Sequence, residues 1–399
     1  WIKIVLLVFT AGLIILVAPH FSKIEAARVL LPFAAILVIF DGIREFSSAF
    51  FRAKEKMELE ALVTSATNIA ITVFGFLILR ASQTAGSIAI TYALSAGTGT
   101  LLGIFILRGQ FAKIFSAFRK DLLAPIMNLA WPIAFLSLIG AFMLNVDVVM
   151  LGFFKGAKEV GFYSAGQKIV QLLYTFPSIL AASFYPVLAK FLGQKDGGRV
   201  RMLMEKGMTA SFLLALPIAV GGIVLAKSII VFLYGTAYLP AVHNLQVLLF
   251  TIIVIFPSLQ ISNYLMIYDR QRKMLPIVLA GSLSNIIFNV VLIPPYGILG
   301  AAIATVLAQF IYVGLEWRLA KAANNFVTFP HLKKIVLATF FMGIISFTIN
   351  QFPIHLLLNI SVSATAYFLI LYFLKESSIL EIKSLMMRRK PTGSSDLET

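Results

Sequence analysis

The sequence contains no cysteine, and only 13% of its 399 residues are charged. The missing cysteine excludes disulfide bonds, thiolate zinc sites and thiol catalysis. The scarcity of charge, with 60% hydrophobic residues and a mean hydropathy of +0.94, excludes an ordinary soluble domain. Histidine is also rare: its four positions lie far apart, so we expect no metal site. The composition predicts a membrane protein that crosses the bilayer many times.

Nucleotide-binding motifs are missing as well. No G-x-x-x-x-G-K-[ST] pattern occurs, so we expect no nucleotide hydrolysis by this chain. The segment from Gly99 to Gly103 resembles a phosphate loop only superficially, because it lies within an apolar run. We interpret these two glycines as a small-xxx-small motif that lets helices pack closely.

Long apolar runs occupy most of the chain. Crossing the ~30 Å hydrocarbon layer takes about 20 apolar residues in a helix. The runs reach this length and lack the alternation of barrel strands, so we predict an all-α membrane protein with twelve transmembrane helices. The expected spans are 2–18, 29–50, 60–79, 86–107, 127–150, 162–189, 206–226, 241–267, 275–293, 297–317, 333–350 and 356–374.

Lysine and arginine are concentrated in every second connection. Of the 33 such residues, 24 lie on one side of the predicted membrane and 6 on the other. The positive-inside rule makes the richer side cytoplasmic, which places both termini of this chain there. We therefore interpret the net charge of +16 as a topology signal in a multi-pass cytoplasmic (inner) membrane protein, and we expect no nucleic-acid partner.

The sequence also contains an internal repeat. Several residues recur 217 positions later, and a second group recurs after 214. The matches are Lys56-Met57, Ser65 and Asn68-Ile69 with Lys273-Met274, Ser282 and Asn285-Ile286, and Gly86 and Thr91 with Gly300 and Thr305. They align the third and fourth spans with the ninth and tenth. Six spans per unit is an even number, so the two copies share one orientation and are related by an axis along the membrane normal.

This repeat predicts two pseudo-symmetric helical lobes. The N-terminal lobe, residues 1–107, would hold the last four of six helices, and the C-terminal lobe, 127–319, all six. Between them we expect a cytoplasmic amphipathic linker, 108–126, with Phe111, Ile114, Phe115 and Phe118 on one face. Two additional helices follow at 332–374, and then a disordered cytoplasmic tail, 375–399. With two helices missing at the front, the full protein is expected to have fourteen.

Two charged residues of opposite sign fall inside neighbouring spans. Asp147 and Lys168 each lie roughly 10 Å below the same predicted surface, at 1.5 Å per residue. An unpaired charge at this depth would cost several kcal/mol, so we expect the two to pair. Either Lys168 attracts a phosphate group while Asp147 tunes it, or the two form a static pair that locks the helices together.

A second charged group lies in the span 29–50. Asp41, Arg44 and Glu45 are spaced i, i+3 and i+4 and therefore share one helical face. In a functional interpretation Arg44 binds a diphosphate, with Asp41 as its counter-charge or as a proton site. In the alternative, Arg44 and Glu45 simply begin the cytoplasmic end of the helix with Arg52.

Neutral polar residues and prolines also interrupt the spans. Asn145, Gln167 and Gln171 are our candidates for sugar contacts, whereas hydrogen bonds between helices explain most of the others, Asn128, Asn285, Asn289 and Gln309. Pro177, Pro217 and Pro257 should kink their helices, either as hinges or as fixed bends.

Several motifs resemble one known family. They are Asp147-Val-Val-Met-Leu-Gly152, Glu159-Val-Gly-Phe-Tyr163-Ser-Ala, Tyr185-Pro186-Val-Leu, Tyr234-Gly235 with Tyr238, and Asn289-Val-Val-Leu-Ile-Pro294-Pro-Tyr-Gly297-Ile-Leu-Gly300-Ala-Ala-Ile-Ala-Thr305. Together these segments resemble the polysaccharide-transporter, O-antigen (Wzx-like) branch of the multidrug/oligosaccharidyl-lipid/polysaccharide flippase superfamily. The resemblance implies two six-helix lobes, often with two further C-terminal helices.

The resemblance also implies a function. We expect a flippase that moves polyprenyl-diphosphate-linked oligosaccharide across the membrane by alternating access, with H⁺ or Na⁺ as coupling ion, for instance at Asp41. Its partners would be the lipid-linked substrate, membrane lipids and polysaccharide polymerisation machinery, with no cofactor. Arg44, Asp41, Lys168, Asp147, Asn145, Gln167 and Gln171 are the expected substrate-binding or pathway residues.

Two relatives of this function and one enzyme class are the alternatives. A drug/cation antiporter of the same superfamily should favour acidic and aromatic groups over Arg44 and Lys168. A peptidoglycan-precursor flippase also stays open. A membrane glycosyltransferase, polymerase or ligase would need a large outer loop with catalytic carboxylates, and the loop 148–161 offers only Glu159, so we expect no enzyme.

Overall fold

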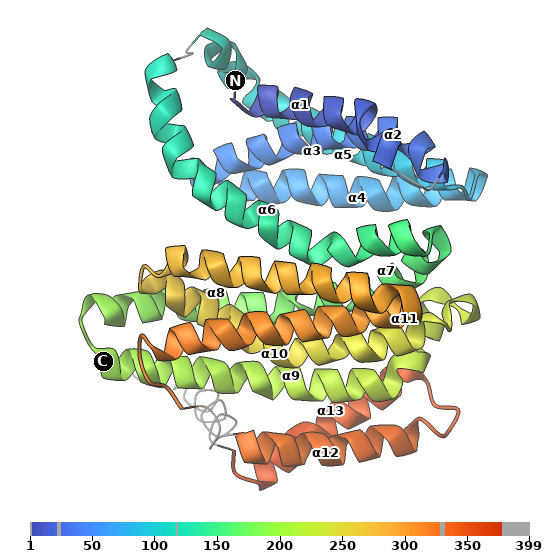
Figure 1. Ribbon diagram of the computed structural model, residues 1–399, viewed down its shortest axis with the longest axis vertical. Helices are drawn as coiled ribbons and strands as arrows, with labels where there is room; N and C mark the ends of the chain where they lie inside the picture. The colour runs from blue at the N-terminus through green and yellow to red at the C-terminus, as the bar shows by residue number, and fades with distance from the viewer. Residues whose placement is uncertain (1, 22–24, 117–118, 328–331, 377–399) are drawn as a thin grey trace, which may run out of the picture. The chain divides into compact units, whose positions relative to one another are not determined.

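The computed structural model describes residues 2–21, 25–116, 119–327 and 332–376, and every regular element in these ranges is a helix (Figure 1). This confirms the predicted all-α fold. The elements are α1 (Ile2–Leu16), α2 (Ala18–Phe21), α3 (Glu25–Ala53), α4 (Met57–Ala81), α5 (Ala85–Ser116), η1 (Lys120–Leu122), α6 (Leu123–Phe154), α7 (Ala157–Leu173), α8 (Thr175–Gly193), α9 (Gly197–Tyr234), η2 (Thr236–Tyr238), α10 (Ala241–Ile267), α11 (Gln271–Lys321), α12 (Leu332–Ile349) and α13 (Leu356–Phe373).

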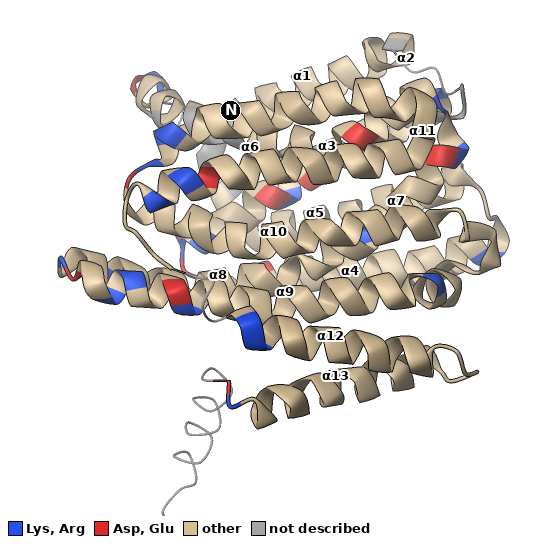
Figure 2. Ribbon diagram, turned by 60° about the horizontal axis from the view of Figure 1, so that its bottom comes forward, with Lys and Arg blue, Asp and Glu red and all other residues tan. Residues whose placement is uncertain are grey.

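Ten segments in the described ranges are long and apolar enough to cross a membrane. One of them, Gln271–Lys321, covers two of the expected spans, and α3 is not among the ten. Charged positions gather mainly toward the ends of the helices (Figure 2). These findings support a multi-pass membrane protein, while the expected count of twelve, or fourteen, stays a prediction.

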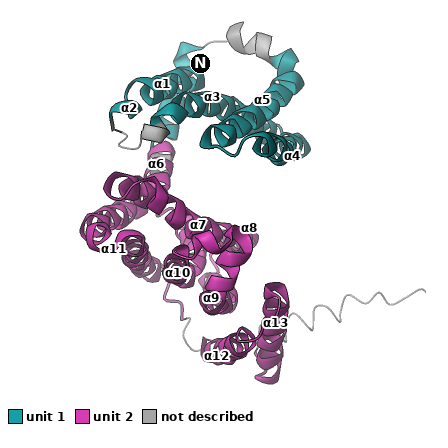
Figure 3. Ribbon diagram, turned by 90° about the vertical axis from the view of Figure 1, so that its right-hand side faces the viewer, with its two compact units in different colours: residues 1–132 teal, residues 133–399 magenta. Residues whose placement is uncertain are grey.

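The chain divides into two compact units, residues 1–132 and 133–399 (Figure 3). In unit 1, α3 packs against α1, α4 and α5. In unit 2, α10 packs against α7, α8, α9 and α11, and most of its side chains are buried. The division falls inside α6, and the lobe boundaries expected from the sequence stay a prediction.

The C-terminal helices α12 and α13 belong to unit 2. They pack against each other and against α9 through a core that includes Leu213, Met342 and Tyr367. The Tyr367 hydroxyl donates a hydrogen bond to the Leu213 carbonyl at 2.8 Å. Burial of these apolar side chains and this buried bond fix the pair on α9.

Two expected features fall on residues that the structure describes only in part. Helix α5 continues beyond residue 107 to Ser116, so no helix end marks the start of the expected linker. The side chains of the predicted amphipathic face, at 111–118, lie outside the described part, as does most of the expected tail, 377–399. Within the linker, Arg119 forms an exposed ion pair with Asp121 at 2.6 Å.

Proline interrupts the sixth expected span. Helix α7 ends at Leu173 and α8 begins at Thr175, two residues before Pro177. The chain thus breaks into two helices where a kink was predicted, and Pro177 occupies the first turn of α8, where its missing N–H costs no helical hydrogen bond. Pro217 and Pro257 lie inside the unbroken helices α9 and α10.

Helix α11 is a hairpin of two helical arms. Its 51 residues would extend about 77 Å if straight, far more than a bilayer. The chain turns at Gly297, which has φ +55° and ψ −130° directly after Pro294, Pro295 and Tyr296. A Cβ on Gly300 would lie 2.1 Å from the Leu292 carbonyl oxygen. The two arms therefore pack this closely because residue 300 has no side chain. The two arms correspond in position to the expected spans 275–293 and 297–317.

Gly300→Ala should therefore loosen the hairpin. The added methyl group meets backbone atoms rather than a flexible side chain, so we expect a loss of about 1–3 kcal/mol, seen as a lower unfolding temperature of the purified protein in detergent. Gly314→Ala on the same helix is the control, because no atom lies within 4 Å of a Cβ there. Equal unfolding temperatures for the two variants would contradict this account of the turn.

Candidate functional site

A buried carboxylate connects three helices of unit 2. Asp147 on α6 is 1% exposed. It accepts hydrogen bonds from the Tyr163 hydroxyl of α7 at 2.9 Å, from Thr305 Oγ1 at 2.7 Å and from Asn289 Nδ2 at 2.6 Å. Asn289 and Thr305 lie on opposite arms of the α11 hairpin, so both arms donate a hydrogen bond to the carboxylate. We call these four residues the Asp147 network.

The expected ion pair between Asp147 and Lys168 is wrong. Every hydrogen-bond donor of the Asp147 network is neutral, and Lys168 is exposed on α7. The depth estimate did not consider how α7 is rotated about its own axis. Lys168 comes five residues after Tyr163 and therefore points about 140° away from it around the helix. The interpretation of a static pair is thereby excluded, whereas a phosphate role for Lys168 stays a prediction.

A small polar cavity adjoins the Asp147 network. Its volume is about 30 Å³, which is room for one or two waters rather than a sugar ring. Tyr163 and Thr305 line it, together with Gln167, Gln171 and Gln309. Gln167 donates to the Leu144 carbonyl at 2.9 Å. Two of the three predicted sugar contacts thus lie beside a water-sized space.

Asn145, the third predicted sugar contact, is placed differently. It is exposed, and its Nδ2 donates to the Ala141 carbonyl one turn earlier on α6 at 2.9 Å. It does not line the cavity. Its role stays a prediction.

One acceptor in the Asp147 network has no hydrogen-bond donor. The side chain of Asn289 is fully buried, and its Oδ1 makes no hydrogen bond in the described part of the protein. The nearby Asn285 uses its own Oδ1 and carbonyl to accept from Asn289 Nδ2 at 3.0 and 2.9 Å. Carboxylate, hydroxyl and amide oxygens without a positive neighbour are suited to binding a small cation.

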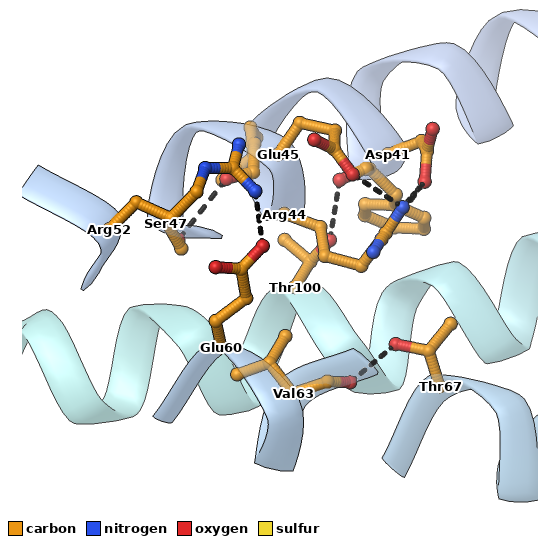
Figure 4. Close-up of polar contacts among 11 residues, drawn as sticks. Asp41, Arg44, Glu45, Ser47, Arg52, Glu60, Val63, Thr67 and Thr100 are labelled. Carbon is orange, nitrogen blue, oxygen red and sulfur yellow. Dashed lines mark hydrogen bonds and ion pairs between the residues drawn. The ribbon is translucent and has the colours of Figure 1, made fainter. Parts of the chain in front are cut away.

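Unit 1 handles its buried charge differently (Figure 4). Arg44 of α3 is 15% exposed and donates to Asp41 Oδ1 from Nε at 2.9 Å and from Nη2 at 2.6 Å. Its Nη2 also contacts Glu45 at 2.9 Å. Both acids are about half exposed. The structure thus brings together the three residues whose spacing predicted one face.

Two glycines of α5 make room for this cluster. A Cβ on Gly99 would lie 2.0 Å from Thr67 Oγ1 of α4 and 3.0 Å from Arg44 Cδ. A Cβ on Gly103 would lie 2.8 Å from Ser47 Oγ of α3. The segment is therefore a close-packing motif, as predicted.

Sequence reasoning missed a second buried acid. Glu316 on α11 is fully buried, and it accepts hydrogen bonds from Ser258 of α10 at 2.6 Å, from Ser262 and from Tyr312. Its signal was present, since it is a charged residue inside the expected span 297–317. Tyr163 and Thr305 lie in the motifs of the family resemblance, but nothing in the sequence assigns them as partners of Asp147.

Two protein families match overlapping parts of the chain. The family described as polysaccharide biosynthesis protein matches residues 1–192, and the MatE family matches residues 132–291. The solved structure of the lipid II flippase MurJ, in its inward closed conformation, is similar with a TM-score of 0.75 over 95% of this chain and 82% of MurJ. At a sequence identity of 19%, this structural similarity shows a common fold.

Both family matches and the MurJ-like fold support a similarity to the multidrug/oligosaccharidyl-lipid/polysaccharide flippase superfamily. This confirms the resemblance that its motifs indicated. The chain is 27% identical over 253 residues to the probable flippase AglR of Haloferax volcanii, and the aligned region covers 60% of this chain and 52% of AglR. It is 26% identical over 264 residues to a probable low-salt glycan biosynthesis flippase of the same organism, covering 63% and 54%. The chain therefore spans about half the length of these curated relatives.

Thr305→Val tests the Asp147 network. The change keeps the side-chain shape but removes a donor to a buried carboxylate, so we expect a loss of about 1.5–3 kcal/mol in unfolding free energy, measured by thermal unfolding in detergent. The loss should shrink in an Asp147→Asn background, because the two side chains interact. Thr365→Val is the control, since that exposed hydroxyl bonds only its own helix. Equal effects at positions 305 and 365 would argue against the network.

Proposed function

We propose that this protein translocates polyprenyl-diphosphate-linked oligosaccharide, the repeat unit of a polysaccharide, across the cytoplasmic membrane by alternating access. The observation that carries the proposal is positive charge inside an expected span of each unit, Arg44 in α3 and Lys168 in α7. Such charge is costly in a bilayer and suits an anionic head group. The match to a polysaccharide biosynthesis family and the similarity to two probable flippases of Haloferax volcanii support it.

The two cations have different roles in this proposal. Arg44 is held by Asp41 and Glu45, which orient its guanidinium and offset its charge until a diphosphate arrives. Lys168 forms no ion pair in the described part of the protein and is exposed, so it offers a point charge at lower reorganisation cost. Exported units would then pass to polysaccharide polymerisation machinery.

An apolar pocket of unit 2 suits the polyprenyl chain. It has a volume of about 370 Å³ and lies among α7, α9, α10, α12 and α13. Leu213, Pro217, Gly221, Met342 and Phe368 are among its lining residues, and no charged residue lines it. We place part of the lipid tail there while the head group contacts the charged positions.

We place the coupling cation, H⁺ or Na⁺, at Asp147 rather than at Asp41. Asp41 already has Arg44 as a partner and is half exposed. Asp147 is buried among neutral oxygen-bearing groups, and the unpaired Asn289 Oδ1 adds a further oxygen. A cation here would neutralise the carboxylate and tighten α6, α7 and both arms of α11 around it, which is a means of favouring one conformation.

Two other functions of the superfamily are less favoured. Residues 132–291 match the MatE family, but Arg44 and Lys168 disfavour a cationic drug. The similarity to MurJ, at 19% identity, extends to the fold alone and does not single out a peptidoglycan precursor.

Arg44→Ala and Lys168→Ala should each strongly reduce export of lipid-linked sugar while the protein still reaches the membrane. Losing one charge-assisted phosphate contact corresponds to a drop of about 10- to 100-fold. Export is measured as surface glycan in cells that lack their own flippase, with protein amount checked by immunoblot. Lys158→Ala, an exposed lysine near the start of α7, is the control. Wild-type export in both variants would remove these residues from the site.

Asp147→Asn should make transport independent of the cation gradient. The amide keeps the shape of the carboxylate but cannot neutralise a bound cation, so the rate with an imposed Na⁺ or H⁺ gradient should fall to the rate without one. The assay uses purified protein in liposomes. Asp269→Asn, at an exposed turn residue with φ +52°, is the matched control because asparagine tolerates that conformation. A gradient response retained in Asp147→Asn would place the coupling site elsewhere.

A further inference from the structure

Glu316 has more polar neighbours than helix packing requires. It is fully buried on the second arm of α11. Ser258 and Ser262, one turn apart on α10, both donate to its carboxylate, at 2.6 Å for Ser258, and Tyr312 approaches it at 3.3 Å. Two carboxylate oxygens and three hydroxyl oxygens therefore converge on one point. We call these four residues the Glu316 cluster.

No positive charge offsets this carboxylate. Among the described residues, no lysine, arginine or histidine forms an ion pair with Glu316. Tyr312 is the titratable group in contact with it, and Arg318 and Lys321 follow on the same helix but are exposed. A neutral glutamine could also join α10 to α11, whereas a buried carboxylate without a cationic partner costs several kcal/mol. The negative charge of Glu316 therefore indicates that this position binds a cationic ligand.

One face of α11 links the Glu316 cluster to the Asp147 network. Thr305, Gln309, Tyr312 and Glu316 follow one another at intervals of four, three and four residues, which keeps them within about 60° around the helix. From Thr305 to Glu316 the rise is about 16 Å. Gln309 and Thr305 both line the water-sized cavity beside Asp147. Polar side chains thus run along the helix from one buried acid to the other.

We propose that the Glu316 cluster is a second binding site for a monovalent cation, reached before the Asp147 network by an ion that enters from the end of α11 carrying Arg318 and Lys321. The inference rests on the proposed function only in taking Asp147 as the coupling site. Hydroxyl and carboxylate oxygens suit Na⁺, and the same oxygens suit a proton. An ion that moves from the Glu316 cluster to the Asp147 network would pass Gln309 and the small cavity.

A single tryptophan can report on this site. Trp317 is the residue after Glu316, and the chain has three tryptophans in all. The variant Trp1→Phe/Trp131→Phe leaves Trp317 alone as a fluorophore in the full chain. The purified protein is titrated with NaCl against choline chloride at constant ionic strength, and separately with acid in sodium-free buffer. A saturable change in Trp317 emission with Na⁺, with acid or with both is the expected result, and the two arms identify the cation.

Variants of the cluster decide whether the response belongs to it. Glu316→Gln should abolish the response, and Ser258→Ala or Ser262→Ala should weaken the apparent affinity about tenfold or more. The serine variants keep the inference testable if Glu316→Gln fails to fold. Glu58→Gln and Ser178→Ala are the controls, because Glu58 is exposed in unit 1 and Ser178 bonds only its own helix. A silent Trp317 in both titrations, or an unchanged response in Glu316→Gln and both serine variants, overturns the proposal.

Transport measurements separate this inference from the proposed function. If Asp147→Asn removes the gradient response and Glu316→Gln leaves it at the wild-type level, the second site is refuted and the proposed function stands. If the wild-type protein moves no lipid-linked sugar but Trp317 still responds through Glu316, the proposed function fails and the cation site stands.

Discussion

The structure depends on one constraint: a polar group at membrane depth must find its partners within the protein, because the hydrocarbon layer offers none. Asp147 meets this constraint with a hydroxyl from α7, a hydroxyl from one arm of α11 and an amide from the other. The carboxylate therefore determines how α6, α7 and the hairpin face one another. A single buried anion sets the arrangement of three elements that are far apart in the sequence.

The two units satisfy the same constraint in different ways. In unit 1 an arginine is paired with two acids that are half exposed, and glycines at 99 and 103 bring the surrounding helices close. In unit 2 the buried acids Asp147 and Glu316 have only neutral partners among the described residues. Charge neutralised by charge is suited to holding and releasing an anionic ligand. Anions with neutral partners are suited to accepting a cation, because occupancy relieves the uncompensated charge.

Much of the fold follows from the sequence. Apolar length predicts the helices, including the two arms of α11 as the separate spans 275–293 and 297–317, and the spacing of Gly99 and Gly103 predicts close packing. These features are local or depend on one helix, so a pattern is enough to find them. The motifs around Asp147 and Asn289 likewise carry the resemblance to the flippase superfamily that the family matches support.

The partners within the site did not follow from the sequence. Residue counting gives the depth of Asp147 and Lys168 but not how each helix is rotated about its axis, and rotation is what turns Lys168 away. Glu316 lies four residues after Tyr312 and finds two serines on a helix about 55 positions earlier, a contact that only tertiary packing creates. Spacing along one helix predicts a shared face, as for Asp41, Arg44 and Glu45, but the neighbour across the interface is set by the fold.

The most direct test of the account is a flipping assay with the wild-type protein in liposomes. A fluorescent polyprenyl-diphosphate sugar is placed in both leaflets, and its accessibility to a membrane-impermeant reagent is followed after a Na⁺ or H⁺ gradient is imposed. The account predicts faster exchange of this anionic lipid than in protein-free liposomes, with a further increase under one of the two gradients. Exchange at the protein-free rate, with gradient-driven movement of a cationic dye instead, would contradict it.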